Sequence, residues 1–576
     1  MVAISLSAIA FAGDAANVEA AQSVPPIPAQ TWRMTEITLS SDRDYAKPLE
    51  AVMVTATFTS TGGVTIVRPV FWDGDRSWRV RFAAPSPGVW TMLTASSEPG
   101  DAGLHGVRRT LAVSPYPGDL PIYRHGFLKI SSTGRYLAHA DDTPFLWMSE
   151  DHACLDGERF DESNKPGTTS HFKHMAELRR KQQFTVYQSV IWTVSNWATP
   201  ELPKLDYYRG LDRKYAYLAD LGYVHSIALG YHKDLGDGQL DPAKLAAMRR
   251  IARYVEGRYG AYPMAYYTCG EFNIPADKDA QPELQGPEKT YNRHWWGQVA
   301  SAIHENNSYG HPSSINYWQP QGTWFADQPF MRFWNLQAYS LRDHAYYGFW
   351  WKRQSPRPII DSFSGMDHGT PASQRDQRAI AYVVMQSGGA GWGFLVEGIW
   401  NNCYTKDSGI CAAQWGGTPW STTIDWAGVT GLTHAYAFYM ARPWWRLTPR
   451  FGDPAWADFA DATRSPMTAD DAGTVVVYFY GDGTKTGKLK RLPAVITQRA
   501  SWYDPRSGAY TPIGPVTPAA DGTWTIPQRP DAQDWVLLVE PTGSDQQALT
   551  NVAILSRPAG FTATAAVTNA ETKGKK

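Results

Sequence analysis

The sequence predicts an α/β chain in which a (β/α)8 TIM barrel is flanked by N-terminal and C-terminal β-sandwich domains. Between about residues 120 and 450, short apolar runs alternate with amphipathic stretches of helical period, which is the pattern of βα units. On either side of this region, short alternating runs are separated by Gly- and Pro-rich turns, which is typical of β-sandwiches. The central region contains eight candidate strands, the number of a closed barrel.

Residues 24–118 are predicted to form the N-terminal sandwich. Polar and apolar residues alternate in Val52–Phe58 and Trp78–Phe82, as expected for strands with one buried face. Turns rich in Gly, Pro and Asp lie between these runs. The spacing favours several short antiparallel strands.

Residues 119–452 are predicted to form the barrel. Its strands should be Pro144–Glu150, Phe184–Ile191, Tyr223–Gly230, Met264–Gly270, Pro312–Tyr317, Met331–Gln337, Arg357–Asp361 and Gly391–Glu397. The intervening helical patterns are His171–Gln182, Tyr207–Leu221, Pro242–Tyr259, Tyr291–Asn306 and Ser373–Gln386.

The two ends of the chain carry different signals. Residues 453–545 are again strand-like, with runs such as Thr474–Tyr480 and Trp535–Glu540, and are predicted to form the C-terminal sandwich. Residues 546–576 are small and polar, so we expect a disordered tail. Residues 1–23 begin with a short apolar run followed by small residues, which resembles a secretory signal peptide. We therefore expect a secreted or periplasmic protein.

Composition narrows the class of partner. The formal net charge is -1, which gives no basis for binding nucleic acid or an acidic membrane. The chain has 25 Trp, 30 Tyr and 21 Phe, and such side chains offer flat faces that suit sugar rings as well as large cores. The four cysteines form no Cys/His cluster of metal-ligand spacing, so we expect no metal or cofactor. Cys403 and Cys411 share one loop and can pair if the protein is exported.

Carboxylate, amide and aromatic side chains follow the predicted strands. Glu271 comes directly after Met264–Gly270, where a barrel enzyme positions a catalytic acid. Glycoside cleavage needs one carboxyl group that protonates the leaving oxygen and a second that attacks the anomeric carbon or activates water. We predict Glu271 as the acid/base. Asp361 is the first choice for the second carboxyl and Glu397 is the alternative; each can instead bind substrate or pair with an arginine.

Further residues at the strand tips are predicted to bind the sugar. Hydrogen-bonding and ring-stacking groups are what such a site requires. An N-cap aspartate with a hydrogen-bonded histidine is the competing interpretation of the Asp-His pair that follows the first strand. The predicted substrate-binding residues are Asp151, His152, Gln188, Trp192, His232, Asn273, Trp318 and Gln337.

The barrel region resembles the apiosidase-like glycoside hydrolases. The resemblance lies in ordered pieces: "FLWMSEDHAC", "FTVYQSVIW", "YYTCGEFN", "WNLQAYSLRDH" and "GWGFLVEGIWN". It implies a (β/α)8 catalytic domain, with Asp151 on the family aspartate, Glu271 on the acid/base position and Gln337 on the family glutamine. The segment from Phe71 to Met92 resembles the β-sandwich that precedes some bacterial glycosidase barrels. The segment "ASWYDPRSGAYTPIG" with "DWVLLVE" resembles the β-sandwich called a collagen-binding domain.

One departure from the family pattern concerns the seventh strand. The resemblance implies a glutamate nucleophile about five residues after Pro358, and Phe363 occupies that position. Asp361 lies two residues earlier, on the same strand face if period-two alternation continues. The identity of the second carboxyl therefore stays open between Asp361 and Glu397.

We expect a glycoside hydrolase acting on a polysaccharide or oligosaccharide. A non-catalytic carbohydrate-binding protein on the same barrel is one alternative, because the family glutamate is missing. A polysaccharide lyase is another, with Tyr231 and His232 as the only candidate base pair.

Overall fold

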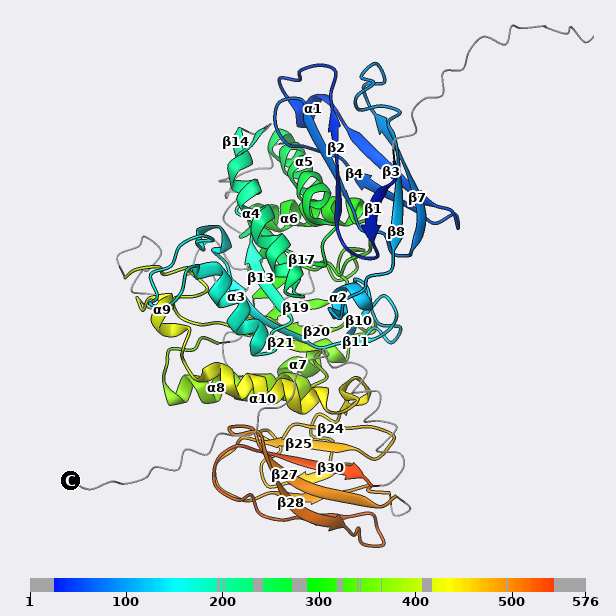
Figure 1. The fold of residues 1–576 in the computed structure, drawn as a ribbon. Helices are drawn as coiled ribbons and strands as arrows, with labels where there is room; N and C mark the ends of the chain where they lie inside the picture. Colours follow the sequence, from blue (N-terminus) through cyan, green and yellow to red (C-terminus); the bar gives the residue numbers. More distant parts are fainter. Residues whose placement is uncertain are drawn as a thin grey trace, which may run out of the picture.

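The computed structural model shows three regions in a row, with the barrel between two sandwiches (Figure 1). The structure describes residues 25–542, apart from 194–196, 200–201, 232–241, 272–286, 319–324, 339–340, 342, 364, 407–416 and 494–495. The predicted signal peptide, the tail and the residues His232, Asn273 and Cys411 lie outside the described residues.

The central sheet has eight strands that pair in parallel and confirms the predicted barrel. Its order is β17-β16-β13-β12-β21-β20-β19-β18. A parallel bridge between Tyr266 and Ser313 joins the two ends of this order. Each strand lies within or overlaps its predicted segment. The strands are β12 (Trp147–His152), β13 (Val186–Val190), β16 (Val224–Tyr231), β17 (Met264–Gly270), β18 (Asn316–Trp318), β19 (Trp334–Gln337), β20 (Ile359–Asp361) and β21 (Gly391–Phe394).

Helices surround the sheet and make its outer face as buried as its inner face. Parallel strands covered in this way are apolar or uncharged along most of their length. The five predicted helices are present as α3 (His171–Lys181), α4 (Leu205–Asp220), α5 (Pro242–Tyr259), α6 (Pro287–Asn306) and α8 (Pro371–Gln386). The longer helices α7 (His344–Trp351) and α10 (Gly428–Met440) were not among those predicted.

Each flanking region is built from two packed sheets. In the N-terminal region one sheet contains β1 (Ile27–Gln30), β8 (Arg108–Ser114), β7 (Gly88–Ser96), β3 (Val54–Ser60) and β4 (Thr65–Pro69), and the other contains β2 (Thr35–Ser40), β6 (Ser77–Phe82) and β5 (Phe71–Trp72). In the C-terminal region the larger sheet contains β22 (Thr448–Pro449), β24 (Met467–Ala469), β25 (Val475–Phe479), β30 (Trp535–Pro541), β27 (Gln498–Asp504) and β28 (Ala509–Val516). The smaller sheet contains β23 (Ala457–Phe459), β26 (Gly487–Leu489) and β29 (Trp524–Ile526).

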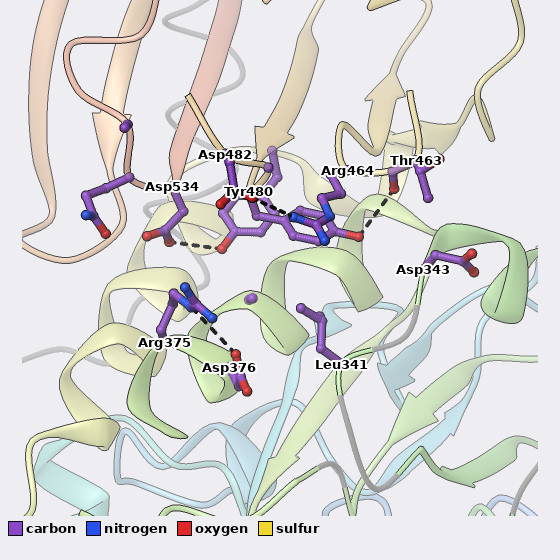
Figure 2. Close-up of a pocket in the computed structure, with 14 residues that line it drawn as sticks. Leu341, Asp343, Arg375, Asp376, Thr463, Arg464, Tyr480, Asp482 and Asp534 are labelled. Atoms are coloured by element: carbon purple, nitrogen blue, oxygen red, sulfur yellow. Dashed lines mark hydrogen bonds and ion pairs between the residues drawn. The ribbon is translucent and has the colours of Figure 1, made fainter. Parts of the chain in front are cut away.

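The C-terminal sandwich packs on helix α8 through a charged and aromatic contact. Arg378 donates two hydrogen bonds to Asp534, of 2.8 and 2.7 Å, and the hydroxyl of Tyr478 donates to the same carboxylate at 2.9 Å. Tyr382 stacks on Tyr478 with ring centroids 4.8 Å apart. Figure 2 shows Asp534 directed from the sandwich toward the helical layer. A bidentate pair of this kind fixes orientation as well as distance.

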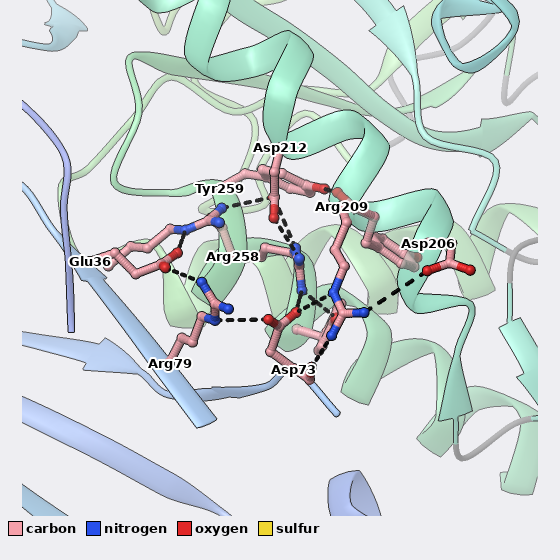
Figure 3. A network of polar contacts seen from close by, with 11 residues as sticks. Glu36, Asp73, Arg79, Asp206, Arg209, Asp212, Arg258 and Tyr259 are labelled. Carbon is pink, nitrogen blue, oxygen red and sulfur yellow. Dashed lines mark hydrogen bonds and ion pairs between the residues drawn. The ribbon is translucent and has the colours of Figure 1, made fainter. Parts of the chain in front are cut away.

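The N-terminal sandwich is joined to the barrel by buried arginines. Arg68 and Glu256, both fully buried, form an ion pair at 2.7 Å. Figure 3 shows Arg258 of α5 between Asp73 of the sandwich and Asp212 of α4, at 2.9 and 2.5 Å. Because each buried charge has an opposite partner, the interface is held as one unit.

None of the described helices is long and apolar enough to cross a bilayer. The described residues also contain no group of three or more His, Cys, Asp or Glu side chains arranged to hold a metal ion. Cys154 and Cys269 form no disulfide, and Cys403 is disulfide-bonded.

Candidate active site

Strand β12 presents different chemistry on its two faces. Asp151 pairs in register with Gln188 of β13, and both side chains face the barrel interior, which we call the lumen. Glu150 and His152, one residue to either side, face the helical layer, where Arg179 of α3 donates to Glu150 at 2.9 Å. The alternation of side chains along a strand therefore separates Asp151 from its two neighbours.

Glu271 stands at the carboxyl end of β17 after an irregular stretch of strand. The register with β16 shifts on both sides of Ala228, and Thr268 and Glu271 have φ values of 35° and 53°. Left-handed φ values are rare for residues other than glycine, and they concentrate at functional sites together with bulges. Gly270 directly precedes Glu271, and a Cβ atom there would lie 2.4 Å from the ring of Tyr231. The bulge and the glycine together direct Glu271 into the end of the lumen.

Amide side chains from neighbouring strands hold Glu271. Gln337 at the end of β19 donates from Nε2 to Glu271 Oε1 at 2.8 Å. The backbone N–H of Glu271 donates to Asn316 Oδ1 at 2.9 Å. Asn316 in turn donates to Asn335 at 3.0 Å, and Ser362 donates to the same Asn335 oxygen at 2.7 Å. This polar row fixes both the backbone and the carboxylate of Glu271.

Asp151 and Glu271 interact electrostatically across the lumen. Burial raises the pKa of Asp151 to about 8, and the negative charge of Glu271 acts in the same direction. The charge of His152 and a hydrogen bond from Gln188 oppose this rise in pKa. Asp151 is therefore protonated at neutral pH, while its side chain is only 1 % exposed. A proton-carrying carboxyl beside a second carboxyl is the arrangement that acid-base catalysis requires.

Several buried polar atoms around these carboxyls have no hydrogen-bond partner within the described part of the chain. Buried polar atoms are normally bonded, so such a concentration suggests a place where a ligand or water binds. The atoms are Asp151 Oδ1, Gln188 Oε1, Ser226 Oγ, Asn335 Nδ2 and Gln337 Oε1.

Aromatic residues cover the lumen at the same end. Trp192 and Tyr231 are partly buried and lie with ring centroids 5.4 Å apart. Phe363 packs on Tyr267 at 5.7 Å, and both belong to a small apolar cluster separate from the main core. Partly exposed rings beside hydrogen-bonding groups suit a sugar.

Asp361 does not face the lumen, which corrects its predicted position. It pairs in register with Leu336 and Trp392, which belong to the core between strands and helices. The hydroxyl of Tyr347 of α7 donates to Asp361 at 2.5 Å. Period-two alternation ends with β20 at Asp361, so Phe363 and Asp361 lie on different faces. A carboxylate fully buried against the helices does not fit the role of nucleophile.

Glu397 lies near the lumen end but is already bonded. Its carboxylate accepts from Thr418 Oγ1 at 2.7 Å and from the Thr418 N–H at 3.2 Å, and His368 Nδ1 lies at 3.0 Å. These contacts lower the pKa of Glu397 against the effect of its burial. Glu397 is suited to holding two loops together.

His152 is also directed away from the lumen, which does not fit direct contact with a sugar. Its ring lies between Glu158 and Glu150, at 2.6 and 3.0 Å, and stacks on Tyr187. The two carboxylates overcome the effect of burial and raise the pKa of His152 to about 9. An imidazolium in the helical layer therefore lies behind Asp151.

The structure brings together Asp151, Gln188, Trp192, Glu271 and Gln337 from the predicted residues. His232 and Asn273 lie outside the described residues, and for Trp318 only the backbone is described. Sequence reasoning missed the polar row of Asn316, Asn335 and Ser362. The two asparagines could have been recognised from the sequence, because Asn is unusual within otherwise apolar strands.

Similar solved structures carry names that describe glycoside hydrolases. "A putative glycoside hydrolase from Bacteroides vulgatus ATCC 8482" is 15% identical over 90% of this chain and 100% of that chain, with a TM-score of 0.67. A protein named only "Glycoside hydrolase" is 17% identical over 74% of this chain and 100% of that chain, with a TM-score of 0.59. "A glycoside hydrolase family 5 from Bacteroides vulgatus ATCC 8482" is 17% identical over 75% of this chain and 96% of that chain, with a TM-score of 0.56. At these identities the likeness shows the fold.

Family models identify all three regions. The model described as "Apiosidase-like, catalytic domain" matches residues 131–446, more than half of the chain. The chain therefore belongs to the apiosidase-like family. Residues 28–97 match a "Domain of unknown function", and residues 459–540 match a "Putative collagen-binding domain of a collagenase". No curated protein matches the sequence.

Proposed function

We propose that this protein hydrolyses an O-glycosidic bond in a polysaccharide or oligosaccharide, with Glu271 and Asp151 as its two carboxyl groups. The observations that carry the proposal are the electrostatic interaction of these two side chains and the group of buried polar atoms near them that have no hydrogen-bond partner among the described residues. Membership of the apiosidase-like family supports the reaction class.

The two carboxyls take different roles because their surroundings differ. Asp151, protonated at neutral pH by burial, donates its proton to the leaving oxygen. Glu271, held by Gln337 at a partly exposed strand tip, supplies the carboxylate that attacks the anomeric carbon or activates water. The proposal keeps Glu271 as one of the two reacting carboxyls but changes its predicted role from acid/base to nucleophile or base. Asp151 replaces Asp361 and Glu397 as the other carboxyl and supplies the proton.

A lyase mechanism is less well supported. It needs a base that removes a proton from the sugar, and Tyr231 was the main candidate. Burial and the nearby carboxyl of Asp151 raise the pKa of Tyr231 well above its usual value, so the phenol is a poor base precursor at neutral pH.

The test separates the two roles by comparing a substrate whose leaving group needs a proton with one whose leaving group does not. A panel of polysaccharides assayed for new reducing ends identifies the sugar, and a dinitrophenyl glycoside of that sugar then serves as a substrate that needs no proton. Asp151→Asn should lose about 10²-fold or more on the natural substrate and retain activity on the aryl glycoside, since acid catalysis contributes about 10²–10⁴-fold. Glu271→Gln should lose activity on both, with partial recovery in azide. An Asp151→Asn variant equally impaired on both substrates would contradict the assignment.

A further inference from the structure

A pocket lies between the barrel and the C-terminal sandwich. It has a volume of about 490 Å³, within the usual range for small-molecule sites. Figure 2 shows Leu341 and Asp343 on the barrel side and Arg464, Tyr480 and Asp482 on the sandwich side. Neither of the proposed catalytic carboxyls belongs to its lining.

An aromatic ring is fixed in this pocket. Tyr480 is half-buried and stacks on Tyr478, with ring centroids 5.5 Å apart and planes at 20°. Its hydroxyl donates to the carbonyl oxygen of Thr463 at 3.3 Å. A ring held at both its face and its hydroxyl loses little conformational freedom when a ligand stacks on it. Such a ring suits the apolar face of a sugar.

The charged groups around the ring are paired loosely enough to accept hydroxyl groups. Arg464 and Asp482 lie 3.5 Å apart, and Arg375 and Asp376 lie 3.7 Å apart, with all four side chains substantially exposed. Exposed pairs at these distances contribute little to stability and can exchange partners. Carboxylates accept from sugar hydroxyls and guanidinium groups donate to them.

The balance of charge selects the kind of sugar. Asp534 is neutralised by its bidentate contact with Arg378. The remaining lining holds the aspartates Asp343, Asp376 and Asp482 and the arginines Arg375 and Arg464. The excess of negative charge disfavours a uronate and favours a neutral sugar.

The pocket lies at the same end of the barrel as the candidate active site. Leu341 and Asp343 follow β19, whose last residue Gln337 holds Glu271. Arg375 lies in the first turns of α8, just beyond the connection from β20. In a (β/α)8 barrel these connections form the catalytic end, so a chain seated in the pocket can continue toward the lumen.

We propose that the pocket between α8 and the C-terminal sandwich is an auxiliary site that binds a neutral sugar unit of a polysaccharide. The identity of that polysaccharide rests on the proposed function, because it is the polymer that the barrel cleaves. Tyr480 provides the stacking face, and the arginine–aspartate pairs provide hydrogen bonds to the ring hydroxyls.

The experiment measures binding and cleavage separately on the full chain. Affinity electrophoresis of the Glu271→Gln variant is run through gels containing neutral galactan, arabinan, xylan or glucomannan, or polygalacturonate. The same gels carry Tyr480→Ala and Arg464→Ala on that background. Matched controls are Phe349→Ala, an aromatic residue 46% exposed on α7, and Arg499→Ala, an exposed arginine in β27. Otherwise wild-type chains with the same substitutions are assayed for kcat and KM on the polymer and on a short oligosaccharide.

We expect at least one neutral polysaccharide to retard the protein and both pocket variants to bind it about tenfold more weakly, while the controls bind normally. KM for the polymer should rise by a similar factor, with kinetics on the short oligosaccharide unchanged. Retardation only by polygalacturonate, or pocket variants that match their controls, would overturn the proposal. Binding through Tyr480 without any cleavage would leave this site standing and contradict the hydrolase. Cleavage of the polymer that the pocket substitutions leave unchanged would support the hydrolase and contradict the auxiliary site.

Discussion

The two faces of strands β12 and β20 carry similar polar residues, but the hydrogen-bond partners of these residues differ between the faces. On the outer face, Glu150, His152 and Asp361 each contact partners within the protein. On the lumen face, Asp151 and its register partner Gln188 retain buried atoms without a partner in the described chain.

This difference separates structure from function better than residue type does. A buried charge whose partners are all internal stabilises or orients the fold, and removing one partner leaves the other uncompensated. A buried polar group without an internal partner is costly to the fold and is usually explained by a ligand, water or catalysis. Substitutions among the lumen-facing residues should therefore change activity, and substitutions among the residues that face the helices should change stability.

The largest effect is expected at Glu271 on the lumen face. Glu271→Gln keeps the contact with Gln337 but removes the carboxylate, so kcat/KM should fall by about 10³-fold or more. The melting temperature should stay close to that of the wild type, because the substitution is nearly isosteric. Measured activity above a tenth of the wild-type value would remove Glu271 from the chemistry.

The outer face should respond in stability instead. Glu158→Gln removes one of the two carboxylates beside the His152 imidazolium, and leaving a buried charge short of its partner costs about 3–5 kcal/mol. Chemical denaturation measures this loss. Activity per folded molecule should change little. A variant as stable as the wild type would show that His152 is not charged in the folded protein.

Gln337→Ala tests the positioning of Glu271. The substitution removes one hydrogen bond to the carboxylate, worth about 1.5–3 kcal/mol for a charged acceptor, so kcat should fall by about 10- to 100-fold. Gln337→Glu is the matched comparison, since it keeps the size and adds a repelling charge; its kcat should be lower still at neutral pH. Unchanged kcat in both variants would contradict a positioning role.

Asp151 should lower the stability of the folded protein as pH rises. The pKa of its carboxyl is about 8 in the folded chain and about 3.9 when unfolded. Between these values the unfolded state releases a proton that the folded state keeps, so stability falls as pH increases. Asp151→Asn removes this term and should be more stable than the wild type by roughly 1–3 kcal/mol at pH 8, with no gain at pH 4. The other titrating groups are common to the wild type and the variant, so the pH dependence of the difference between their stabilities isolates Asp151. A difference that does not grow with pH would contradict the raised pKa.

The sequence predicted the existence and order of the barrel strands well, since each is an apolar run that ends in polar residues. It predicted which residues stand at strand ends, including Glu271 and Gln337. It did not predict which face they occupy. In β20 the run of Ile359, Ile360 and Asp361 shows no alternation, because both faces are buried. For the same reason Asp151 and His152 could not be assigned to opposite faces from the sequence alone.

The most direct measurement compares Asp151→Asn with Asp361→Asn in one assay of natural substrate cleavage. Both substitutions replace a fully buried aspartate on a barrel strand by its isosteric amide. We predict a loss of kcat of about 10²-fold or more for Asp151→Asn, and a change of less than about threefold for Asp361→Asn once corrected for the fraction folded. Loss of activity in Asp361→Asn with full activity in Asp151→Asn would contradict the assignment of the second carboxyl to the lumen face of β12.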